Sequence, residues 1–229
     1  MVGVLTPQSV RPRRPHRQAP PAPVLAGCGP WKPPRCARRP RLEDAHWWYR
    51  ERRHLLAREV RGLVPGRALD VGAAGGGNTR VLRALGWDAA ALEYGEEGAG
   101  VARSRGLATL RADATRLPVA DASLDLVVAF DVLEHIEDDD AAVREVARSL
   151  RPGGHFVVAV PCDPRLWSEH DEAVLHVRRY TRATLTSLLV RAGLQVGPLH
   201  SLERAAAAGG AGAPPGQPGQ RPGRAWRRG

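Results

Sequence analysis

The stretch ALDVGAAGGGNT, residues 68–79, decides the fold. Its apolar start ends at Asp70, and four glycines then fall within six residues. The apolar run predicts a strand, and the inward-facing Val81, Leu82 and Leu85 predict a helix after the glycines. A strand, a glycine turn and a helix N-terminus direct backbone N–H groups at one point, which is typical of a ligand site. The sequence therefore predicts a small-molecule site at this turn.

The spacing of the glycines disfavours the two common phosphate-binding loops. The dinucleotide fingerprint needs glycine at positions one, three and six. Counted from Gly72, the third position is Ala74, and counted from Gly75, the sixth is Arg80. The phosphate loop of nucleotide hydrolases needs a Gly-Lys-Ser/Thr sequence, and the one lysine of the chain is Lys32. The turn therefore gives only weak support for a bound phosphate.

Strand-like and helix-like segments alternate after the first helix, which predicts βα units and a doubly wound α/β fold with a mostly parallel sheet. The run LDLVVAF at 124–130 is apolar apart from Asp125, as in a strand covered on both faces. The expected strands are 67–72, 88–93, 107–112, 124–130, 155–160 and 194–200. The expected helices are 43–64, 78–86, 96–105, 137–150 and 181–193.

The charge divides the 229-residue chain into three parts. The formal net charge of +10 consists of +9 in residues 1–41, −3 in 42–202 and +4 in 203–229. The first part holds ten of the 20 prolines, and the last is rich in Gly, Pro, Ala and Arg. Because neither shows apolar periodicity, we predict two disordered tails around one folded domain at 42–202. Any basic surface for nucleic acid would lie in these tails.

The lack of targeting signals and the spacing of the cysteines argue against several classes of protein. The N-terminus lacks the apolar core of a secretory signal, and no run of 18 apolar residues predicts a membrane span. The three cysteines, Cys28, Cys36 and Cys162, do not have the spacing of a metal knuckle or a disulfide framework. We expect a cytoplasmic protein.

Four blocks of sequence resemble the class I S-adenosylmethionine (SAM)-dependent methyltransferases, in a branch similar to methyltransferase types 11 and 23. The turn fits the family's acid-x-Gly-x-Gly-x-Gly motif, with Ala74 at the middle glycine. An acid, Glu93, ends the second strand, and the stretches 111–138 and 150–161 are similar to the next two blocks. The resemblance covers about residues 43–200 and implies a Rossmann-like domain that binds SAM and transfers a methyl group.

The resemblance also implies roles for individual residues. Asp70 would orient the ammonium group of SAM, and Glu93 would accept hydrogen bonds from both ribose hydroxyls. Asp113 would accept from the adenine amino group, and the backbone N–H of Ala114 would meet the ring. The full set of expected cofactor-binding residues is Asp70, Gly72, Gly76, Glu93, Asp113, Ala114 and Asp131.

The sequence DVLEH, residues 131–135, leaves two interpretations open. His135 is a candidate general base, although a histidine that packs at the start of a helix is the simpler interpretation. Some quinone-pathway O-methyltransferases of similar sequence use acids and a histidine near this position for a metal. That use would need Asp131, Glu134 and His135 to converge, and we expect no metal.

The segment 166–181 follows the fifth strand and leaves the sheet on its ligand side. Its many ionisable side chains suggest a lid or wall for the substrate, with His170 and Tyr180 as candidate catalytic residues. The alternative is a solvated connection held by an Arg–Asp pair. The segment resembles one in a bacterial branch of the family that also carries the HWWYR sequence, here His46–Arg50.

The expected function is methyl transfer from SAM to a small-molecule acceptor, without specific binding of nucleic acid. One alternative is an NAD-type oxidoreductase, and another is an inactive methyltransferase-like protein. The family's seventh strand pairs with the sixth and inserts beside the fifth, but no strand is evident after residue 200. The composition of both tails is that of GC-rich DNA read in a wrong frame. We therefore hypothesise a true start near residue 42 and a reading frame lost soon after residue 200.

Overall fold

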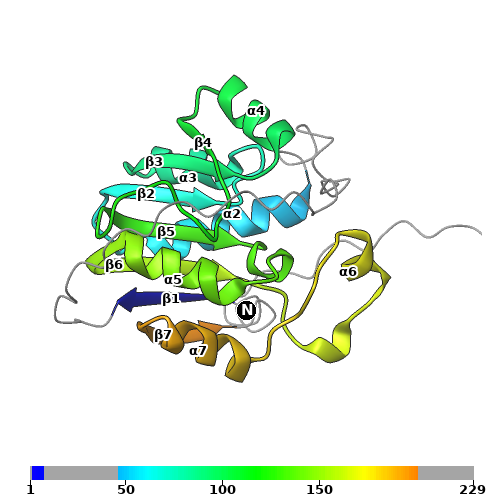
Figure 1. The fold of residues 1–229 in the computed structure, drawn as a ribbon. Coiled ribbons are helices and arrows are strands. Elements are labelled where there is room, and N and C mark those ends of the chain that lie inside the picture. Colours follow the sequence, from blue (N-terminus) through cyan, green and yellow to red (C-terminus); the bar gives the residue numbers. More distant parts are fainter. Residues whose placement is uncertain (1, 8–45, 201–229) are drawn as a thin grey trace, which may run out of the picture.

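The computed structural model describes residues 2–7 and 46–200 and contains one seven-stranded sheet (Figure 1). The strand order is β4-β3-β2-β5-β6-β1-β7, and the pairs from β4 to β6 are all parallel. The strands are β1 (Val2–Pro7), β2 (Arg67–Val71), β3 (Asp88–Glu93), β4 (Thr109–Arg111), β5 (Leu124–Phe130), β6 (Leu150–Ala159) and β7 (Leu194–His200).

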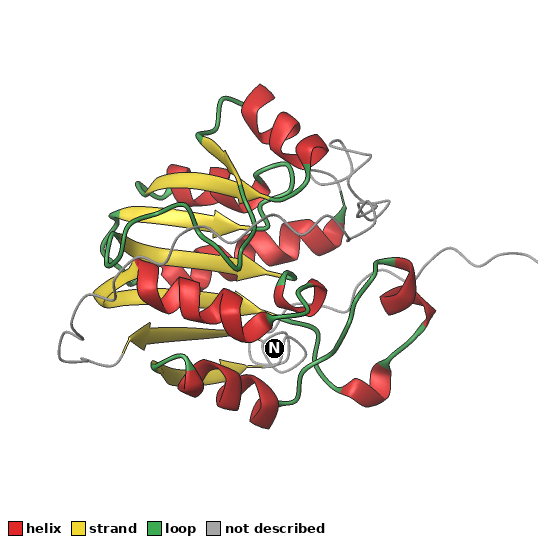
Figure 2. Ribbon diagram, viewed as in Figure 1, coloured by secondary structure: helices red, strands yellow, loops and turns green. Residues whose placement is uncertain are grey.

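Helices cover both faces of the sheet, as Figure 2 shows, and this confirms the predicted α/β class. Helices α2 and α3 pack on one face, whereas α5 and α7 pack together on the other. The α-helices are α2 (Trp47–Val60), α3 (Gly77–Ala84), α4 (Glu96–Ser104), α5 (Asp139–Ser149), α6 (Glu169–Ala173) and α7 (Arg182–Arg191). Two 3₁₀ turns, η2 (Leu133–His135) and η3 (Pro164–Leu166), follow β5 and β6.

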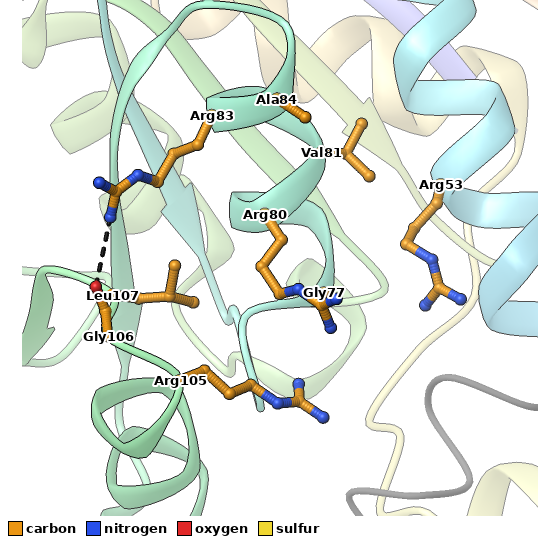
Figure 3. A pocket seen from close by; sticks show the side chains of 9 residues that line it. All are labelled: Arg53, Gly77, Arg80, Val81, Arg83, Ala84, Arg105, Gly106 and Leu107. Atoms are coloured by element: carbon orange, nitrogen blue, oxygen red, sulfur yellow. Dashed lines mark hydrogen bonds between the residues drawn. The ribbon is translucent and has the colours of Figure 1, made fainter.

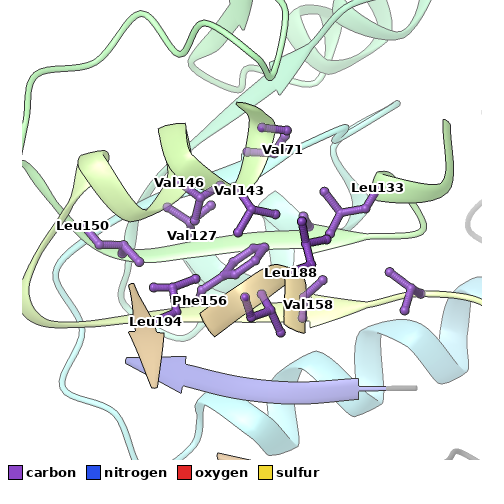
Figure 4. Packing of buried hydrophobic residues seen from close by; sticks show 14 of the residues in the cluster. Val71, Val127, Leu133, Val143, Val146, Leu150, Phe156, Val158, Leu188 and Leu194 are labelled. Atoms are coloured by element: carbon purple, nitrogen blue, oxygen red, sulfur yellow. The ribbon is translucent and has the colours of Figure 1, made fainter. Parts of the chain in front are cut away.

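The apolar run of β5 places alternate side chains in the two halves of the core. Val127 joins the cluster under α5 and α7, with Phe156 at its centre (Figure 4). Val128 joins the opposite cluster, under α2 and α3. Because successive strand residues point to opposite faces, a strand buried on both sides is apolar on both, as β5 is from Leu126 to Phe130. This explains why β5 lacks an alternating pattern and holds the centre of the sheet.

The expected helices and strands from residue 46 to 200 are present in the expected order, and the short helix α6 is an addition that the sequence did not predict. The predicted N-cap Thr181 is also confirmed, since its hydroxyl accepts a hydrogen bond from the backbone N–H of Thr184 at 3.0 Å. None of the helices in the described part of the chain is long and apolar enough to cross a membrane.

Strand β1 departs from the sequence-based expectation. Residues 2–7, which we placed in a disordered tail, pair antiparallel with both β6 and β7. Val2 lies opposite Ala159 on one side and His200 on the other. The strand thus fills the place between β6 and β7, where the family's seventh strand would insert and for which no strand was evident after residue 200. The composition argument failed here because five or six residues suffice for a strand when both neighbours offer backbone partners. The other predicted tail residues lie outside the described residues.

Candidate active site

Four acids lie after the carboxyl ends of four adjacent strands. Asp70 is within the end of β2, Glu93 ends β3, Asp113 follows β4 and Asp131 follows β5. These four strands are neighbours in the sheet. Ligands of open α/β sheets bind in the crevice outside the carboxyl ends of the strands, where the strand order reverses. Here that reversal lies between β2 and β5, next to the glycine turn.

The glycine turn depends on left-handed backbone at three alternate positions. Gly72 has φ +68°, Ala74 has φ +47° and Gly76 has φ +82°. A Cβ atom on Gly72 would overlap Cγ2 of Val132, so the turn packs directly against the segment after β5. Ala74, the one departure from the family's glycine pattern, adopts the conformation that glycine takes without strain.

The acids nearest the turn also hold it in shape. The buried carboxylate of Asp70 accepts a hydrogen bond of 2.6 Å from the Thr79 hydroxyl in the first turn of α3. Glu93 accepts from the backbone N–H of Ala74 at 2.8 Å and of Gly95 at 2.9 Å. Each carboxylate oxygen has a second acceptor position, so Glu93 retains capacity for two further donors.

Asp113 is exposed beyond the end of β4. One of its carboxylate oxygens, Oδ1, accepts from the backbone N–H and from the hydroxyl of Thr115, both at 2.8 Å. This local turn fixes the half-buried Ala114 beside it. The structure therefore places the predicted adenine-binding pair at the same sheet edge as Asp70 and Glu93.

Asp131 forms an ion pair that the sequence analysis did not predict. Its backbone is left-handed, with φ +56°, and its carboxylate accepts from Nη2 of Arg52 on α2. The guanidinium of Arg52 also lies 4.4 Å from the ring centroid of Trp48. Burial raises the pKa of Asp131, although the adjacent Arg52 opposes this shift. The HWWYR sequence lies just before Arg52 and was the one feature of the sequence that pointed to this helix. It did not indicate the partner, because Asp131 is 79 residues further along the chain.

The turn η2 brings Glu134 and His135 to a histidine from the next connection, His176. One ligand atom of each residue lies within 4.8 Å of the others. The pKa of Glu134 is raised well above its usual value, first by burial and then by the nearby Asp131. The pKa of His135 is lowered by burial and by the neighbouring His176. The alternative set of Asp131, Glu134 and His135 does not form as such, since Asp131 turns to Arg52 and His176 takes the third place.

A buried aspartate, Asp171, holds the segment 166–181 together. Arg179 donates to both of its oxygens, at 2.7 and 2.8 Å, and Nδ1 of His176 lies 2.8 Å from Oδ1. The backbone N–H of Val177 donates to the carbonyl of Glu134 at 2.8 Å, which joins the segment to η2. The Arg–Asp pair expected for a simple connection is thus present, in a segment that lies at the carboxyl edge of β5 and β6 (Figure 1).

The two catalytic candidates of this segment lie in different surroundings. His170 is exposed on α6, with its ring centroid 6.5 Å from that of His176. Tyr180 is buried, and its hydroxyl lies 2.7 Å from Oδ2 of Asp139 and 3.2 Å from the carbonyl of Leu133. Burial raises the pKa of Tyr180. This geometry favours a structural role for Tyr180 and leaves His170 at the surface of the site.

An open cavity of about 670 Å³ lies beside the glycine turn, on the outer side of α3 (Figure 3). Four arginines line it: Arg53, Arg80, Arg83 and Arg105. Arg105 donates to the carbonyl of Gly75 at 2.6 Å and Arg83 to that of Gly106 at 3.4 Å. At least these two guanidinium groups support the backbone around the turn.

The hydrogen-bond acceptors at the carboxyl edge of the sheet fit SAM rather than a phosphorylated nucleotide. SAM presents an ammonium group, two ribose hydroxyls and an adenine amine, and all three need hydrogen-bond acceptors. Carboxylates stand at the ends of β2, β3 and β4, in Asp70, Glu93 and Asp113. A pyrophosphate at the glycine turn would instead be repelled by the carboxylate of Asp70, which lies at the end of the strand before that turn.

Comparison with known proteins gives the same result. Residues 69–158 match the family model described as a methyltransferase domain. A probable SAM-dependent methyltransferase of Mycobacterium tuberculosis is 30% identical over 67% of this chain and 58% of its own length. A demethylmenaquinone methyltransferase of Mycolicibacterium paratuberculosis is 40% identical over 51% of this chain and 48% of its own. The chain thus spans about half to three fifths of these relatives.

Among solved structures, a SAM-dependent methyltransferase from Thermotoga maritima, described as a possible histamine N-methyltransferase, is similar. It has a TM-score of 0.55 and 26% identity, over 66% of this chain and 75% of its own. The family match, the relatives and the fold agree with the acids and glycine turn at the carboxyl edge. The chain therefore contains a methyltransferase domain of the class I type, matched at residues 69–158, and the cofactor of that family is SAM.

Proposed function

We propose that this protein transfers the methyl group of SAM to a small-molecule acceptor. The observation that carries the proposal is the set of carboxylates around one glycine turn, Asp70, Glu93 and Asp113, at the ends of three adjacent strands. Bound there, SAM supplies an electrophilic methyl group on its sulfonium. The protein's contribution is to hold the acceptor in line with that group, which accounts for much of the acceleration in such transfers.

The same residues have defined tasks in this proposal. Asp70 orients the ammonium group, Glu93 takes the ribose hydroxyls, and Asp113 with the N–H of Ala114 takes the adenine. Gly72 and Gly76 let the backbone approach the methionine part of SAM. Asp131 precedes Val132, which contacts the glycine turn, and forms the side of the site that faces the acceptor.

The acceptor side of the site consists of η2 and the segment 166–181. His135 lies between these parts, and its Nδ1 is 3.3 Å from the carbonyl of Leu175. Burial lowers its pKa, so His135 is neutral at pH 7 and able to accept a proton. The exposed His170 is the second candidate for this task.

Calorimetry with SAM, its demethylated product and NAD tests the cofactor. Binding of the first two without NAD supports the proposal, and the reverse favours the oxidoreductase alternative. Labelled SAM incubated with a panel of acceptors then tests turnover. The panel starts with demethylmenaquinone, which the name of one relative indicates, and includes duplex DNA as the nucleic-acid control. Cofactor binding without transfer to any small molecule would favour the inactive alternative.

A further inference from the structure

The buried carboxylate of Glu134 lacks the partners that such a group needs. Its side chain is fully buried, and neither Oε1 nor Oε2 has a hydrogen-bond partner on another of the described residues. A buried ionised carboxylate without compensation is strongly unfavourable, and such groups are normally paired or bind a metal. The nearest basic atom is Nε2 of His176, 3.8 Å from Oε1, which is too far for a hydrogen bond.

The hydrogen-bond partners of His176 indicate which ring nitrogen carries the hydrogen. The other nitrogen faces Glu134 without one. Nδ1 lies 2.8 Å from Oδ1 of Asp171, and both oxygens of this carboxylate also accept hydrogen bonds from the guanidinium of Arg179. An ionised carboxylate is only an acceptor, so Nδ1 of His176 carries the hydrogen. In the neutral ring, Nε2 then presents a lone pair toward the carboxylate of Glu134. Two acceptors that face each other at this distance need a cation or a proton between them.

His135 has the same arrangement. Its Nδ1 lies 3.3 Å from the carbonyl of Leu175, which can only accept, so Nδ1 carries the hydrogen and Nε2 keeps its lone pair. The rings of His135 and His176 are 4.7 Å apart between centroids, at an interplanar angle of 71°. A histidine whose second nitrogen is held by a carboxylate or a carbonyl is the usual outer arrangement of a metal ligand.

We propose that Glu134, His135 and His176 bind one Zn²⁺ ion. Two imidazole nitrogens and one carboxylate oxygen are a donor set typical of zinc sites with an open position. Ligand atoms around tetrahedral zinc lie about 3.3 Å apart. The present separations, at most 4.8 Å, close to that value through side-chain rotation. The fourth position is available to water or to an oxygen or nitrogen atom of a second ligand.

The site joins two elements that the sequence separates. Glu134 and His135 belong to η2, which follows β5, whereas His176 belongs to the connection between β6 and α7. The ion therefore fixes the segment 166–181 against the carboxyl edge of the sheet. Zinc on Nε2 of His135 would take the lone pair that a general base needs, so His170 is the remaining candidate base in the zinc-bound protein. Metal binding is measured without SAM and without turnover, so its test is separate from the test of methyl transfer.

The test is Zn²⁺ binding to the metal-depleted full chain, measured by competition with a chromophoric chelator. We expect one equivalent of zinc, and Co²⁺ in its place should give the visible absorption of a four-coordinate site. Glu134→Gln and His176→Gln each keep the size of the site and should lower the zinc affinity by more than about 100-fold. The matched control is His54→Gln, because His54 is exposed on α2, outside the cluster. It should leave the affinity unchanged.

Thermal unfolding covers the case in which a variant folds poorly. Zinc should raise the unfolding temperature of the parent protein and of His54→Gln, and leave that of Glu134→Gln unchanged. The proposal is overturned if the parent binds less than a tenth of an equivalent of zinc. Retention of full affinity by folded Glu134→Gln and His176→Gln would overturn it equally.

Discussion

Arg52 on the first described helix and Asp131 after β5 form an ion pair across 79 residues of sequence. The arginine side chain is only 6% exposed, and the aspartate side chain is 31% exposed. The pair therefore fixes α2 to the segment that also carries η2 and the glycine-turn contact of Val132. Substitutions in α2 should therefore alter the positions of residues at the carboxyl edge of the sheet.

Replacement of Arg52 by Ala should destabilise the protein by about 2–3 kcal/mol. Removing one partner of a buried pair costs roughly 3–5 kcal/mol, and the partial exposure of Asp131 reduces this value. Urea unfolding measures the change. Arg50→Ala, at an exposed position of the same helix, is the control and should stay within about 0.5 kcal/mol of the parent. Equal effects of the two substitutions would contradict the importance of the pair.

Replacement of Ala74 by Gly should stabilise the protein by about 0.5 kcal/mol. Left-handed backbone costs a non-glycine residue roughly 1–2 kcal/mol, and the added freedom of glycine in the unfolded chain offsets part of the gain. Ala141→Gly in helix α5 should have the opposite sign, a loss of about 1 kcal/mol. Comparison of the two urea midpoints tests the prediction, and a loss of stability in Ala74→Gly would show that its backbone is unstrained.

Glu93→Ala should weaken SAM binding by about 1.5–3 kcal/mol, the range for hydrogen bonds to a charged group. Calorimetry gives the affinity, and the unfolding temperature shows whether the loss of the Ala74 and Gly95 contacts disturbs the turn. Glu96→Ala is the control, because its side chain is 79% exposed at the start of α4. A folded Glu93→Ala protein with the affinity of the parent would refute the ribose assignment.

Tyr180→Phe should lower stability by about 1–2 kcal/mol, because Asp139 loses a buried hydrogen bond. SAM affinity should be unchanged, and turnover should fall only as far as the folded fraction does. His170→Ala, at the exposed candidate, should leave stability unchanged while it lowers turnover. If Tyr180→Phe abolishes turnover in a fully folded protein, its hydroxyl has a direct catalytic role after all.

Deletion of residues 1–41 should lower the unfolding temperature and the solubility of the protein. Without β1, the facing edges of β6 and β7 lose their backbone partners. Deletion of residues 211–229, outside the described residues, is the matched control for loss of tail mass. If the shortened chain that starts at residue 42 unfolds at the same temperature as the full chain, the pairing of β1 with β6 and β7 contributes nothing to stability.

The sequence predicted the parts of the site that follow from local pattern. Asp70 and Glu93 were recognisable because each ends an apolar strand, and parallel strands bring their ends to one edge. The contacts of Arg52 and His176 were not predictable in this way. Each contact depends on how a helix or a connection packs against the sheet. The local pattern of apolar residues does not predict such long-range packing.

The position of β1 has a consequence for the order in which the sheet forms. The parallel strands from β2 to β6 follow one another closely in the sequence, mostly through βα units, whereas Val2 must meet Ala159 and His200. Contacts between residues so distant in sequence form late, because loop-closure entropy opposes them until the rest is in place. We therefore expect a folding intermediate with β6 complete and its outer backbone groups still unpaired. Such a species associates readily with another copy of itself, so refolding yield should fall as protein concentration rises.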